Sequence, residues 1–210
     1  MKIKGNTVFI SGGSAGIGLA IARKLALAGN RVIINGRNQE RLDKAVSELK
    51  DAAAIQGDLS VESDRVRIAG ELQTKYPEVN IIINNAGAAF GYLLGEEPNA
   101  HQRASIEMNT NYFAIIHFNE LMIPHLLQKN ESAVVNISSI AVYGGLKIIP
   151  TYGASKAALH SYTMTLRETY RTQQNLGIYE VYPPLVNTAF SSYIGGENGI
   201  APSEVADELL

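Results

Sequence analysis

The stretch Ser11-Gly12-Gly13-Ser14-Ala15-Gly16-Ile17-Gly18 follows a short apolar run, Thr7 to Ile10, and leads into a segment with apolar residues at helical spacing. Glycines let the backbone turn tightly and approach a ligand closely, and the first turn of a helix offers free N–H groups to a phosphate. The pattern predicts a strand, a phosphate-binding turn and a helix. Its spacing, G-x3-G-x-G, differs from the G-x-G-x-x-G dinucleotide fingerprint. Taken alone, the stretch also fits a tight strand-to-helix turn or a site for another nucleotide.

Short apolar runs alternate with longer helical patterns along the rest of the chain. The runs are continuous, which is typical of strands buried on both faces of a parallel sheet. We therefore expect an α/β fold in one domain over residues 1–210: a Rossmann-like doubly wound parallel sheet of six strands with helices on both faces. Gly29 is expected to end the first helix, and Asn38 and Ser60 to cap the next two. The predicted strands are Thr7–Ile10, Arg31–Ile34, Ala52–Ile55, Val79–Ile83, Ala133–Ile137 and Ile178–Tyr182, and the predicted helices are Ile17–Ala28, Asn38–Lys50, Ser60–Tyr76, Gln102–Leu127 and Tyr152–Gln173.

Composition excludes several classes of protein. Lys and Arg number 18 and Asp and Glu 20, so the net charge is −2, and neither nucleic acid nor a membrane surface is expected as a partner. The chain has no cysteine, which excludes disulfides and thiol chemistry and favours a cytoplasmic location. The four histidines lack metal-ligand spacing, and no apolar window is long enough for a signal peptide or a membrane span.

Polar residues follow three successive predicted strands, at the edge of the sheet where such folds bind ligands. The second strand ends at Arg37, without the acid that holds the ribose 2′-hydroxyl of NAD; Arg37, supported by Arg41, can pair with the 2′-phosphate of NADP. The third and fourth strands are followed by Asp58-Leu59 and Asn84-Asn85-Ala86-Gly87. Each is by itself a common turn sequence. Their recurrence predicts a cofactor site that takes NADP rather than NAD.

A serine, a tyrosine and a lysine follow the fifth predicted strand. Ser139 ends it, and Tyr152 and Lys156, 13 and 17 residues later, lie on one face of a helix. Free tyrosine has a pKa near ~10, and an adjacent ammonium lowers it toward neutral pH, where tyrosine can act as acid and base. Ser139 can donate a hydrogen bond to a carbonyl oxygen as negative charge builds there. An isolated Tyr-x-x-x-Lys is more often an exposed helix surface, so the combination of motifs decides.

In combination, these motifs resemble the short-chain dehydrogenase/reductase family, and the resemblance runs from Met1 to about Leu210. It implies an NAD(P) cofactor and a catalytic group of Ser139, Tyr152 and Lys156. The cofactor-binding residues that it implies are Gly12, Ser14, Gly16, Ile17, Gly18, Arg37, Asp58, Leu59, Asn85, Ala86, Gly87, Tyr152, Lys156, Pro183, Val186 and Thr188.

The family has a fourth catalytic residue, an asparagine in the long helix after the fourth strand that holds a water beside the lysine. The resemblance assigns Asn111, because Ala114 and Pro124 follow at the family's spacing, and Asn109 is the alternative. After the sixth strand, Pro183 to Thr188 resembles the segment that grips the nicotinamide carboxamide, with Pro184 in place of the family's glycine. This Pro-Pro-Leu-Val pattern and the opening Met1 to Thr7 resemble the DltE-type oxidoreductases of bacteria.

The predicted function is hydride transfer between NADP and the carbonyl or alcohol carbon of a small, largely apolar substrate. A dinucleotide-binding redox sensor or interaction protein without turnover is the alternative. The substrate walls are expected in residues 88–97, 141–151 and 189–200, which contain no cluster of Arg or Lys. The aromatic and apolar candidates there are Phe90, Tyr92, Val142, Tyr143, Leu146, Phe190 and Tyr193.

Two expectations concern the whole chain. The long helices Gln102–Leu127 and Tyr152–Gln173 carry broad apolar faces, and the family pairs them across a two-fold axis, so a homodimer is expected, with a tetramer as the alternative. Ala201 to Leu210 is predicted to begin the last helix, after which the family has a seventh strand. We therefore expect either a longer native chain or a six-stranded sheet whose sixth strand lies at an edge.

Overall fold

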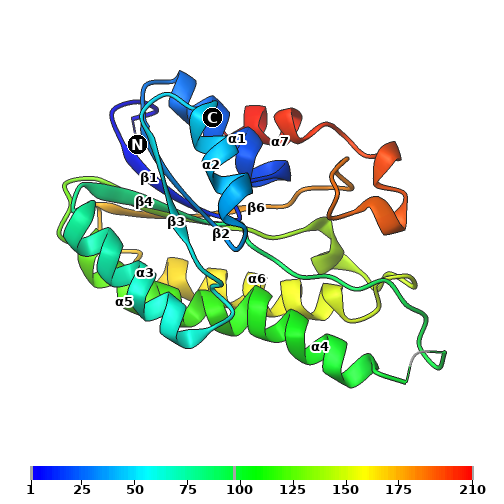
Figure 1. The fold of residues 1–210 in the computed structure, drawn as a ribbon. Coiled ribbons are helices and arrows are strands. Elements are labelled where there is room, and N and C mark those ends of the chain that lie inside the picture. Colours follow the sequence, from blue (N-terminus) through cyan, green and yellow to red (C-terminus); the bar gives the residue numbers. More distant parts are fainter. Residues whose placement is uncertain (1, 97, 210) are drawn as a thin grey trace.

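The computed structural model describes residues 2–96 and 98–209 of the chain. In these residues all strands are parallel and form one six-stranded sheet with the order β3-β2-β1-β4-β5-β6 (Figure 1). The Rossmann-like fold and all six strands expected from the sequence are confirmed. The strands are β1 (Thr7–Ser11), β2 (Arg31–Gly36), β3 (Ala52–Gln56), β4 (Val79–Asn84), β5 (Ser132–Ile137) and β6 (Leu176–Val181).

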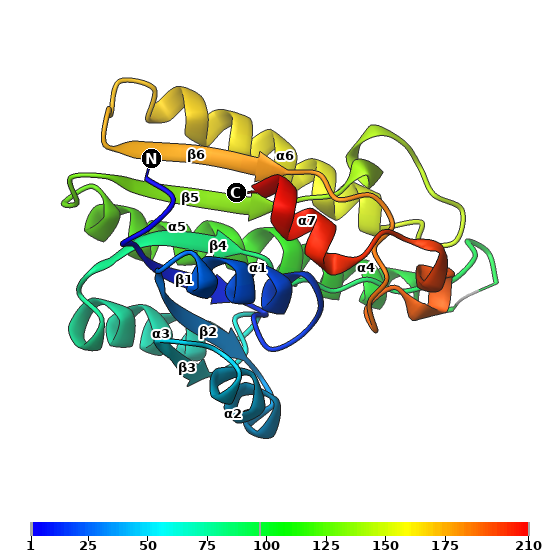
Figure 2. The ribbon, with the colours of Figure 1, turned by 90° about the horizontal axis from the view of Figure 1, so that it is seen from above.

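Helices cover both faces of the sheet. One face carries α1 (Gly16–Leu27), α2 (Gln39–Ser47) and α7 (Pro202–Leu209). The opposite face carries α3 (Glu62–Lys75), α4 (Ala100–Met108), α5 (Ala114–Leu126) and α6 (Tyr152–Thr169), with the sheet between the two layers (Figure 1). Figure 2 looks onto the face with α1 and α7 and shows β6 at the edge of the sheet, beside α6.

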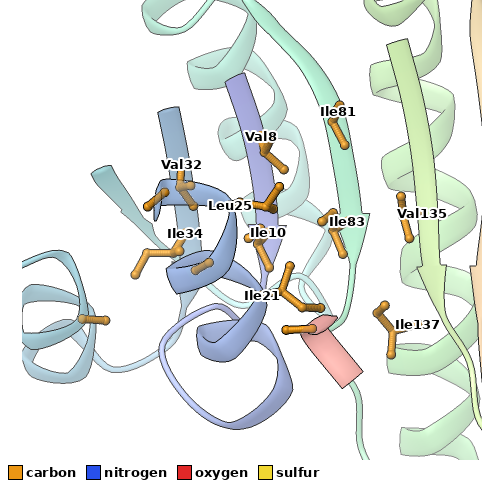
Figure 3. Close-up of a cluster of buried hydrophobic side chains, with 14 of the residues drawn as sticks. Val8, Ile10, Ile21, Leu25, Val32, Ile34, Ile81, Ile83, Val135 and Ile137 are labelled. Carbon is orange, nitrogen blue, oxygen red and sulfur yellow. The ribbon is translucent and has the colours of Figure 1, made fainter. Parts of the chain in front are cut away.

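The core on the α1 side is built from branched apolar side chains. Ile21 and Leu25 of α1 lie over the sheet and belong to one buried cluster with residues of the four central strands (Figure 3). Burial of each such side chain stabilises the fold by about 1.5–3 kcal/mol. The strand residues in this layer are Val8, Ile10, Val32, Ile34, Ile81, Ile83, Val135 and Ile137.

The strand order reverses between β1 and β4, which is where open α/β sheets bind ligands. There the glycine turn after β1 meets the loop after β4. The side-chain amide of Asn85 donates to the backbone oxygens of Ser11 and Gly12, at 2.9 and 3.3 Å. The fold therefore places two motifs side by side that are about 70 residues apart in sequence.

The helix expected over Gln102–Leu127 is interrupted, which corrects the prediction. A π-helical turn, η1 (Asn109–Phe113), separates α4 from α5. Asn111 lies in this turn and is fully buried, and its amide bonds with the backbone of Ala88 rather than facing solvent. Single π turns within helices are frequent at functional sites. Here the wider turn accompanies a side chain that reaches a loop 23 residues away.

Helix caps agree with the prediction at Asn38 and differ at Ser60. Asn38 Oδ1 accepts from the Arg41 backbone N–H at 2.8 Å, as expected for an N-cap. Helix α3 begins later than predicted, with Val61 at the N-cap position and no capping side chain. The reason is Asp58, whose Oδ1 accepts from the Ser60 N–H at 2.9 Å and so holds Ser60 in the preceding turn. Helices α2 and α6 also end three or four residues before their predicted ends.

The described residues contain neither a candidate membrane span nor a candidate metal site. No helix there is long and apolar enough to cross a membrane. No group of three or more histidine, aspartate or glutamate side chains in residues 2–96 and 98–209 is placed to hold a metal ion.

Candidate active site

Glycine is required by the backbone at several positions of the turn after β1. Gly12 and Gly16 have φ values of 64° and 54°, in the left-handed region that favours glycine. A Cβ on Gly18 would clash with the Gly12 carbonyl oxygen and lie 2.6 Å from the amide nitrogen of Asn85. The turn is therefore tight and keeps the start of α1 close to the β4 loop.

The residues around this turn fit the phosphates of a dinucleotide. Helix α1 has no acidic residue in its first turn and no side chain bonded to its first N–H groups, so its positive end is available to an anion. Thr188 lies opposite, because a Cβ on Gly16 would come within 3.3 Å of its methyl group. A small cavity of about 30 Å³ is lined by Asp58 to Ser60 and Ala86, at the ends of β3 and β4.

The Asn-Asn-Ala-Gly segment is held by polar contacts. Ser11 Oγ accepts from the backbone N–H groups of Asn85 and Ala86, at 2.9 and 3.0 Å. Asn84 is buried and donates to the side-chain oxygens of Asn119 and Asn136, at 3.1 and 2.8 Å. Asn84 therefore braces the end of β4 from inside the core, and Asn85 to Gly87 form the surface of the site.

Arg37 lies at the end of β2 with 80% of its side chain exposed. Its guanidinium is 3.7 Å from an Asp58 carboxylate oxygen, at the end of the neighbouring strand β3. No acidic residue follows β2 directly, since Arg37, Asn38 and Gln39 occupy those positions. The exposed guanidinium, which also pairs with Asp58, can reach a phosphate at this edge of the sheet.

Ser139, Tyr152 and Lys156 come together beyond the end of β5. The Ser139 hydroxyl lies close enough to the Tyr152 phenol to lower its pKa, and Lys156 Nζ lies 5.9 Å from the centre of the Tyr152 ring. Lys156 is buried and donates to the Ile137 carbonyl oxygen at 2.8 Å. Gly153 allows this approach, because a Cβ there would lie 2.8 Å from the Ala141 oxygen in the 3-10 turn η2 (Ile140–Tyr143).

Burial changes the ionisation of the tyrosine and the lysine in opposite directions. It raises the pKa of Tyr152 above its ordinary value, and the hydrogen bond from Ser139 opposes the rise. Burial lowers the pKa of Lys156 to about 8, and the Glu180 carboxylate opposes that change. The sequence-based expectation was that Lys156 lowers the pKa of Tyr152; in the structure burial dominates, and the phenol is protonated at neutral pH.

Asn111, rather than Asn109, faces this group. A Cβ built on Gly87 would lie 3.1 Å from Asn111 Oδ1 and 3.9 Å from Lys156 Nζ, so both side chains border Gly87. Asn111 Nδ2 also donates to Ser155 Oγ at 2.8 Å, and Ser155 in turn donates to the Tyr152 carbonyl oxygen. Asn109 is exposed and bonds with the Ser60 backbone oxygen.

Three of the seven predicted substrate residues, Phe190, Tyr193 and Tyr92, lie beside Tyr152 or the preceding Thr151. The Phe190 ring lies 6.4 Å from the Tyr152 ring, and the Tyr193 ring packs tightly on Gly91. Phe90 and Tyr92 come from the loop after β4, and the Tyr92 hydroxyl is 2.7 Å from Thr151 Oγ1. The other three lie on the 140s loop. Val142 is half-buried in η2, Tyr143 packs on Tyr182, and Leu146 is exposed; Glu97, at the end of the first predicted wall, is outside the described residues.

The segment expected to grip the nicotinamide lies over the glycine turn. The Pro183 carbonyl oxygen accepts from the Ile140 N–H at 3.1 Å, which ties this segment to the loop that carries Ser139. Val186 is buried and forms an isolated parallel bridge with Ile200. Pro184 is exposed, so the proline that replaces the family's glycine fits without displacing the buried residues beside it.

Sequence reasoning missed the polar residue Glu107 and gave Thr151 no role beyond the end of an expected substrate wall. Glu107 of α4 is fully buried, and its carboxylate bonds with the Thr151 hydroxyl and the Phe90 backbone N–H. A signal was present in the spacing, because Glu107 lies four residues before Asn111 and therefore near the same face of the helix. Neither residue belongs to a motif quoted above.

A family model described as short chain dehydrogenase matches residues 6–198. The chain belongs to the short-chain dehydrogenase family. The chain is also 35% identical to a protein of Bacillus subtilis (strain 168) named "Uncharacterized oxidoreductase DltE", over 99% of this chain and 82% of that one. The DltE-like assignment made from the sequence is thus confirmed.

Two further proteins illustrate the range of similarity. "NADP-dependent 3-hydroxy acid dehydrogenase YdfG" of Shigella flexneri is 32% identical, over 92% of this chain and 79% of that one. A crystal structure from Burkholderia phymatum, in complex with NAD, superposes with a TM-score of 0.90 at 21% identity, covering 99% and 85% of the two chains. As a short-chain dehydrogenase, this chain is an oxidoreductase that acts on CH–OH or C=O groups with NAD(P).

Proposed function

We propose that this protein is an NADP-dependent carbonyl reductase or alcohol dehydrogenase for small, largely apolar substrates, with Tyr152 as its acid and base. One observation carries the proposal: the Tyr152 phenol lies beside the Ser139 hydroxyl and one helical turn from the buried Lys156, beyond the strand ends that face the glycine turn. Binding alone needs no such trio, so this arrangement favours turnover over the redox-sensor alternative.

Each residue of the trio has a distinct task in the proposed reaction. The bound cofactor supplies or accepts the hydride at nicotinamide C4. Ser139 and Tyr152 donate hydrogen bonds to the substrate carbonyl oxygen, and Tyr152 transfers its proton to that oxygen during reduction. The backbone N–H of Ala141 bonds to Ser139 Oγ at 3.1 Å, which leaves the serine proton free to donate. The Lys156 ammonium stabilises the phenolate that remains.

Asn111 is proposed to hold a water next to Lys156, through which the proton returns from solvent. In support, Asn111 borders Gly87 together with Lys156 Nζ and is bonded at both ends of its amide group. These bonds fix the orientation of the amide, as an ordered water requires.

The preference for NADP rests on Arg37. Its guanidinium is exposed at the end of β2, where a 2′-phosphate can accept a bidentate pair, and no carboxylate stands in the position that binds a 2′-hydroxyl. The name of the Shigella flexneri relative, which states NADP dependence, is consistent with this preference.

The substrate class follows from the walls around Tyr152. Aromatic rings of Tyr92, Phe190 and Tyr193 line them, Phe90 lies on the same loop as Tyr92, and the predicted wall stretches contain no cluster of Lys or Arg that would bind a multiply charged substrate. We therefore propose neutral aliphatic and aromatic aldehydes and ketones, in a cytoplasmic enzyme that acts as a homodimer.

The test is NADPH oxidation by the purified protein with a panel of aldehydes and ketones, among them hexanal, benzaldehyde and 4-nitrobenzaldehyde, each compared with a carboxylate-bearing analogue. The proposal predicts turnover with the neutral compounds and a higher kcat/KM for NADPH than for NADH. Binding of NADPH without turnover on any compound of the panel would instead support the redox sensor.

A further inference from the structure

Glu107 is a buried charge that the proposed reaction does not use. It lies on α4 with none of its surface exposed, and both carboxylate oxygens are bonded. Oε1 accepts from the Phe90 backbone N–H at 2.9 Å, and Oε2 accepts from the Thr151 hydroxyl at 2.6 Å. A buried carboxylate is costly unless such bonds replace its water, so the two contacts account for its presence.

The hydrogen bonds around Glu107 have a fixed direction. Because the Thr151 hydroxyl donates to Glu107, the Tyr92 hydroxyl, 2.7 Å from Thr151 Oγ1, donates to Thr151 in turn. The hydroxyl protons of Tyr92 and Thr151 therefore both point toward the Glu107 carboxylate, as does the Phe90 N–H. An ionised carboxylate, which only accepts, fits this arrangement, and the short contact to Thr151 is typical of a charge-assisted bond.

The two segments that Glu107 joins both face the substrate. One is the loop of residues 88–92, which carries Phe90 and Tyr92. The other is Thr151, the N-cap residue of α6 directly before Tyr152. One turn earlier on α4, Arg103 donates to the Gly91 carbonyl oxygen at 3.3 Å and lies 5.3 Å from the centre of the Tyr92 ring. Through Arg103 and Glu107, helix α4 therefore contacts three consecutive residues of this loop, Phe90, Gly91 and Tyr92.

We propose that Glu107 is a positioning residue: it joins the substrate-facing loop 88–92 to the start of α6 and thereby fixes the position of Tyr152 relative to a bound substrate. The kinetic part of this inference rests on the proposed reductase function, whereas its structural part, the ordering of loop 88–92, does not.

The charge of Glu107 adds a second effect. Three other groups face Tyr152: Ser139 from the loop after β5, Tyr193 from the 3-10 turn η3 (Ser192–Ile194), and Lys156 from α6 itself. The Glu107 carboxylate raises the pKa values of both Tyr152 and Tyr193, and burial raises its own pKa. Removal of this negative charge lowers the pKa of the Tyr152 phenol, so the pH above which Tyr152 can act as the base in alcohol oxidation moves down.

The experiment compares Glu107→Gln with the control Glu120→Gln, which changes an exposed carboxylate on α5. Hydrogen–deuterium exchange of the unliganded protein is followed in peptides that contain residues 88–92. We expect faster exchange in Glu107→Gln, because its amide cannot accept from both donors, and wild-type exchange in Glu120→Gln. Equal exchange at 88–92 in the two variants would overturn the proposal, whatever reaction the protein catalyses.

The kinetic arm uses NADPH and 4-nitrobenzaldehyde. Glu107→Gln should lower kcat for this reduction by roughly tenfold or more through misplacement of Tyr152. In the reverse reaction, oxidation of 4-nitrobenzyl alcohol by NADP, where Tyr152 acts as the base, it should move the acid limb of the kcat/KM profile to lower pH. An unchanged kcat and an unchanged pH profile would contradict the inference. Absence of turnover in the wild-type protein would contradict the proposed function and leave the exchange experiment to decide on Glu107.

Variants of Thr151 separate the effect of the Glu107–Thr151 hydrogen bond from the effect of the Glu107 charge. Thr151→Val keeps the shape of the side chain and the Glu107 charge but removes the link to α6. It should lower kcat without the downward shift of the pH profile, and Thr151→Ser should restore the activity. These two variants also cover the case in which Glu107→Gln fails to fold. A downward shift in Thr151→Val equal to that of Glu107→Gln, or a wild-type kcat, would refute the assigned role.

Discussion

Tyr152 and Lys156 are both buried. The proposed reduction needs a protonated Tyr152 phenol before proton transfer and a charged Lys156 ammonium after it. The phenol, with its raised pKa, is protonated at neutral pH and is therefore ready to donate a proton. The Lys156 ammonium, whose pKa burial lowers to about 8, is present below that pH and is lost above it. Carbonyl reduction is the direction that this pair of protonation states favours.

The pH dependence of reduction follows from Lys156. We expect kcat/KM for carbonyl reduction to be constant near neutral pH and to fall above about pH 8, because the neutral amine no longer stabilises the phenolate. Glu180→Gln should move this decline to lower pH, since the Glu180 carboxylate raises the pKa of Lys156. The measurement is a pH–rate profile of both proteins with NADPH, and coincident profiles would argue against Lys156 as the group that titrates.

The preference for NADPH over NADH is predicted to depend on one side chain, that of Arg37. Arg37→Asp removes the charge-assisted pair with a 2′-phosphate, worth roughly 1.5–3 kcal/mol, and should weaken NADPH binding about 10- to 100-fold. NADH binding should be unchanged or tighter. Fluorescence titration with both cofactors measures the two affinities, and Arg171→Asp, an exposed arginine after the end of α6, is the matched control. Unaltered NADPH affinity in Arg37→Asp would show that Arg37 does not select the cofactor.

At the scale of elements, the close approach of α1 to the β4 loop depends on Gly18. Gly18→Ala places a methyl group against the Gly12 carbonyl oxygen and the Asn85 amide, so it should destabilise the fold by about 1–3 kcal/mol and weaken cofactor binding. Gly70→Ala is the control, because that glycine lies inside α3 with open space around its Cβ position. It should be neutral or stabilise the protein by up to about 1 kcal/mol. Urea unfolding and NADPH titration of the two variants test the difference.

The strands and the glycine turn were predictable because their signals are local. Continuous branched apolar runs and a glycine-rich turn specify them within a few residues of sequence. The π turn at Asn109–Phe113 was not predictable in this way, since it accompanies the bonds of Asn111 to Ala88 and Ser155, 23 and 44 residues away. The late start of α3 has the same origin, because the Asp58 carboxylate holds Ser60 outside the helix.

The same difference between local signals and contacts with distant residues applies to the candidate site. Ser139, Tyr152 and Lys156 could be named from the order and combination of the sequence motifs and the family resemblance, and the structure brings them together. The burial of Glu107 could not be predicted from the sequence, because it depends on contacts with Phe90 and Thr151 from two other segments. The direction of the Tyr152 pKa shift also escaped the sequence, since it is governed by burial and not by the neighbour four residues away.

For the whole molecule, exposed apolar side chains support the expected homodimer. Ile106 of α4, Phe113 of η1 and Met164 of α6 are about half exposed, at 49%, 55% and 55%, and α4 and α6 lie next to each other on one face (Figure 1). Such side chains are natural candidates for burial between two chains related by a two-fold axis.

Light scattering in solution tests this assembly. We expect the mass of two chains for the wild-type protein and the mass of one chain for Phe113→Glu, because a carboxylate at the interface is costly to bury. Leu27→Glu changes an exposed leucine on α1, on the opposite face of the sheet, and should remain a dimer. A wild-type mass of one chain would refute the homodimer.

The most direct test of the central claim, that Tyr152 is the acid and base of a carbonyl reductase, is NADPH oxidation by Tyr152→Phe. The substitution removes only the phenol oxygen. It should lower kcat/KM by roughly 10²–10⁴-fold while NADPH affinity is retained, and Tyr179→Phe, an exposed tyrosine on β6, should keep wild-type activity. Turnover by Tyr152→Phe at the wild-type rate would contradict the account.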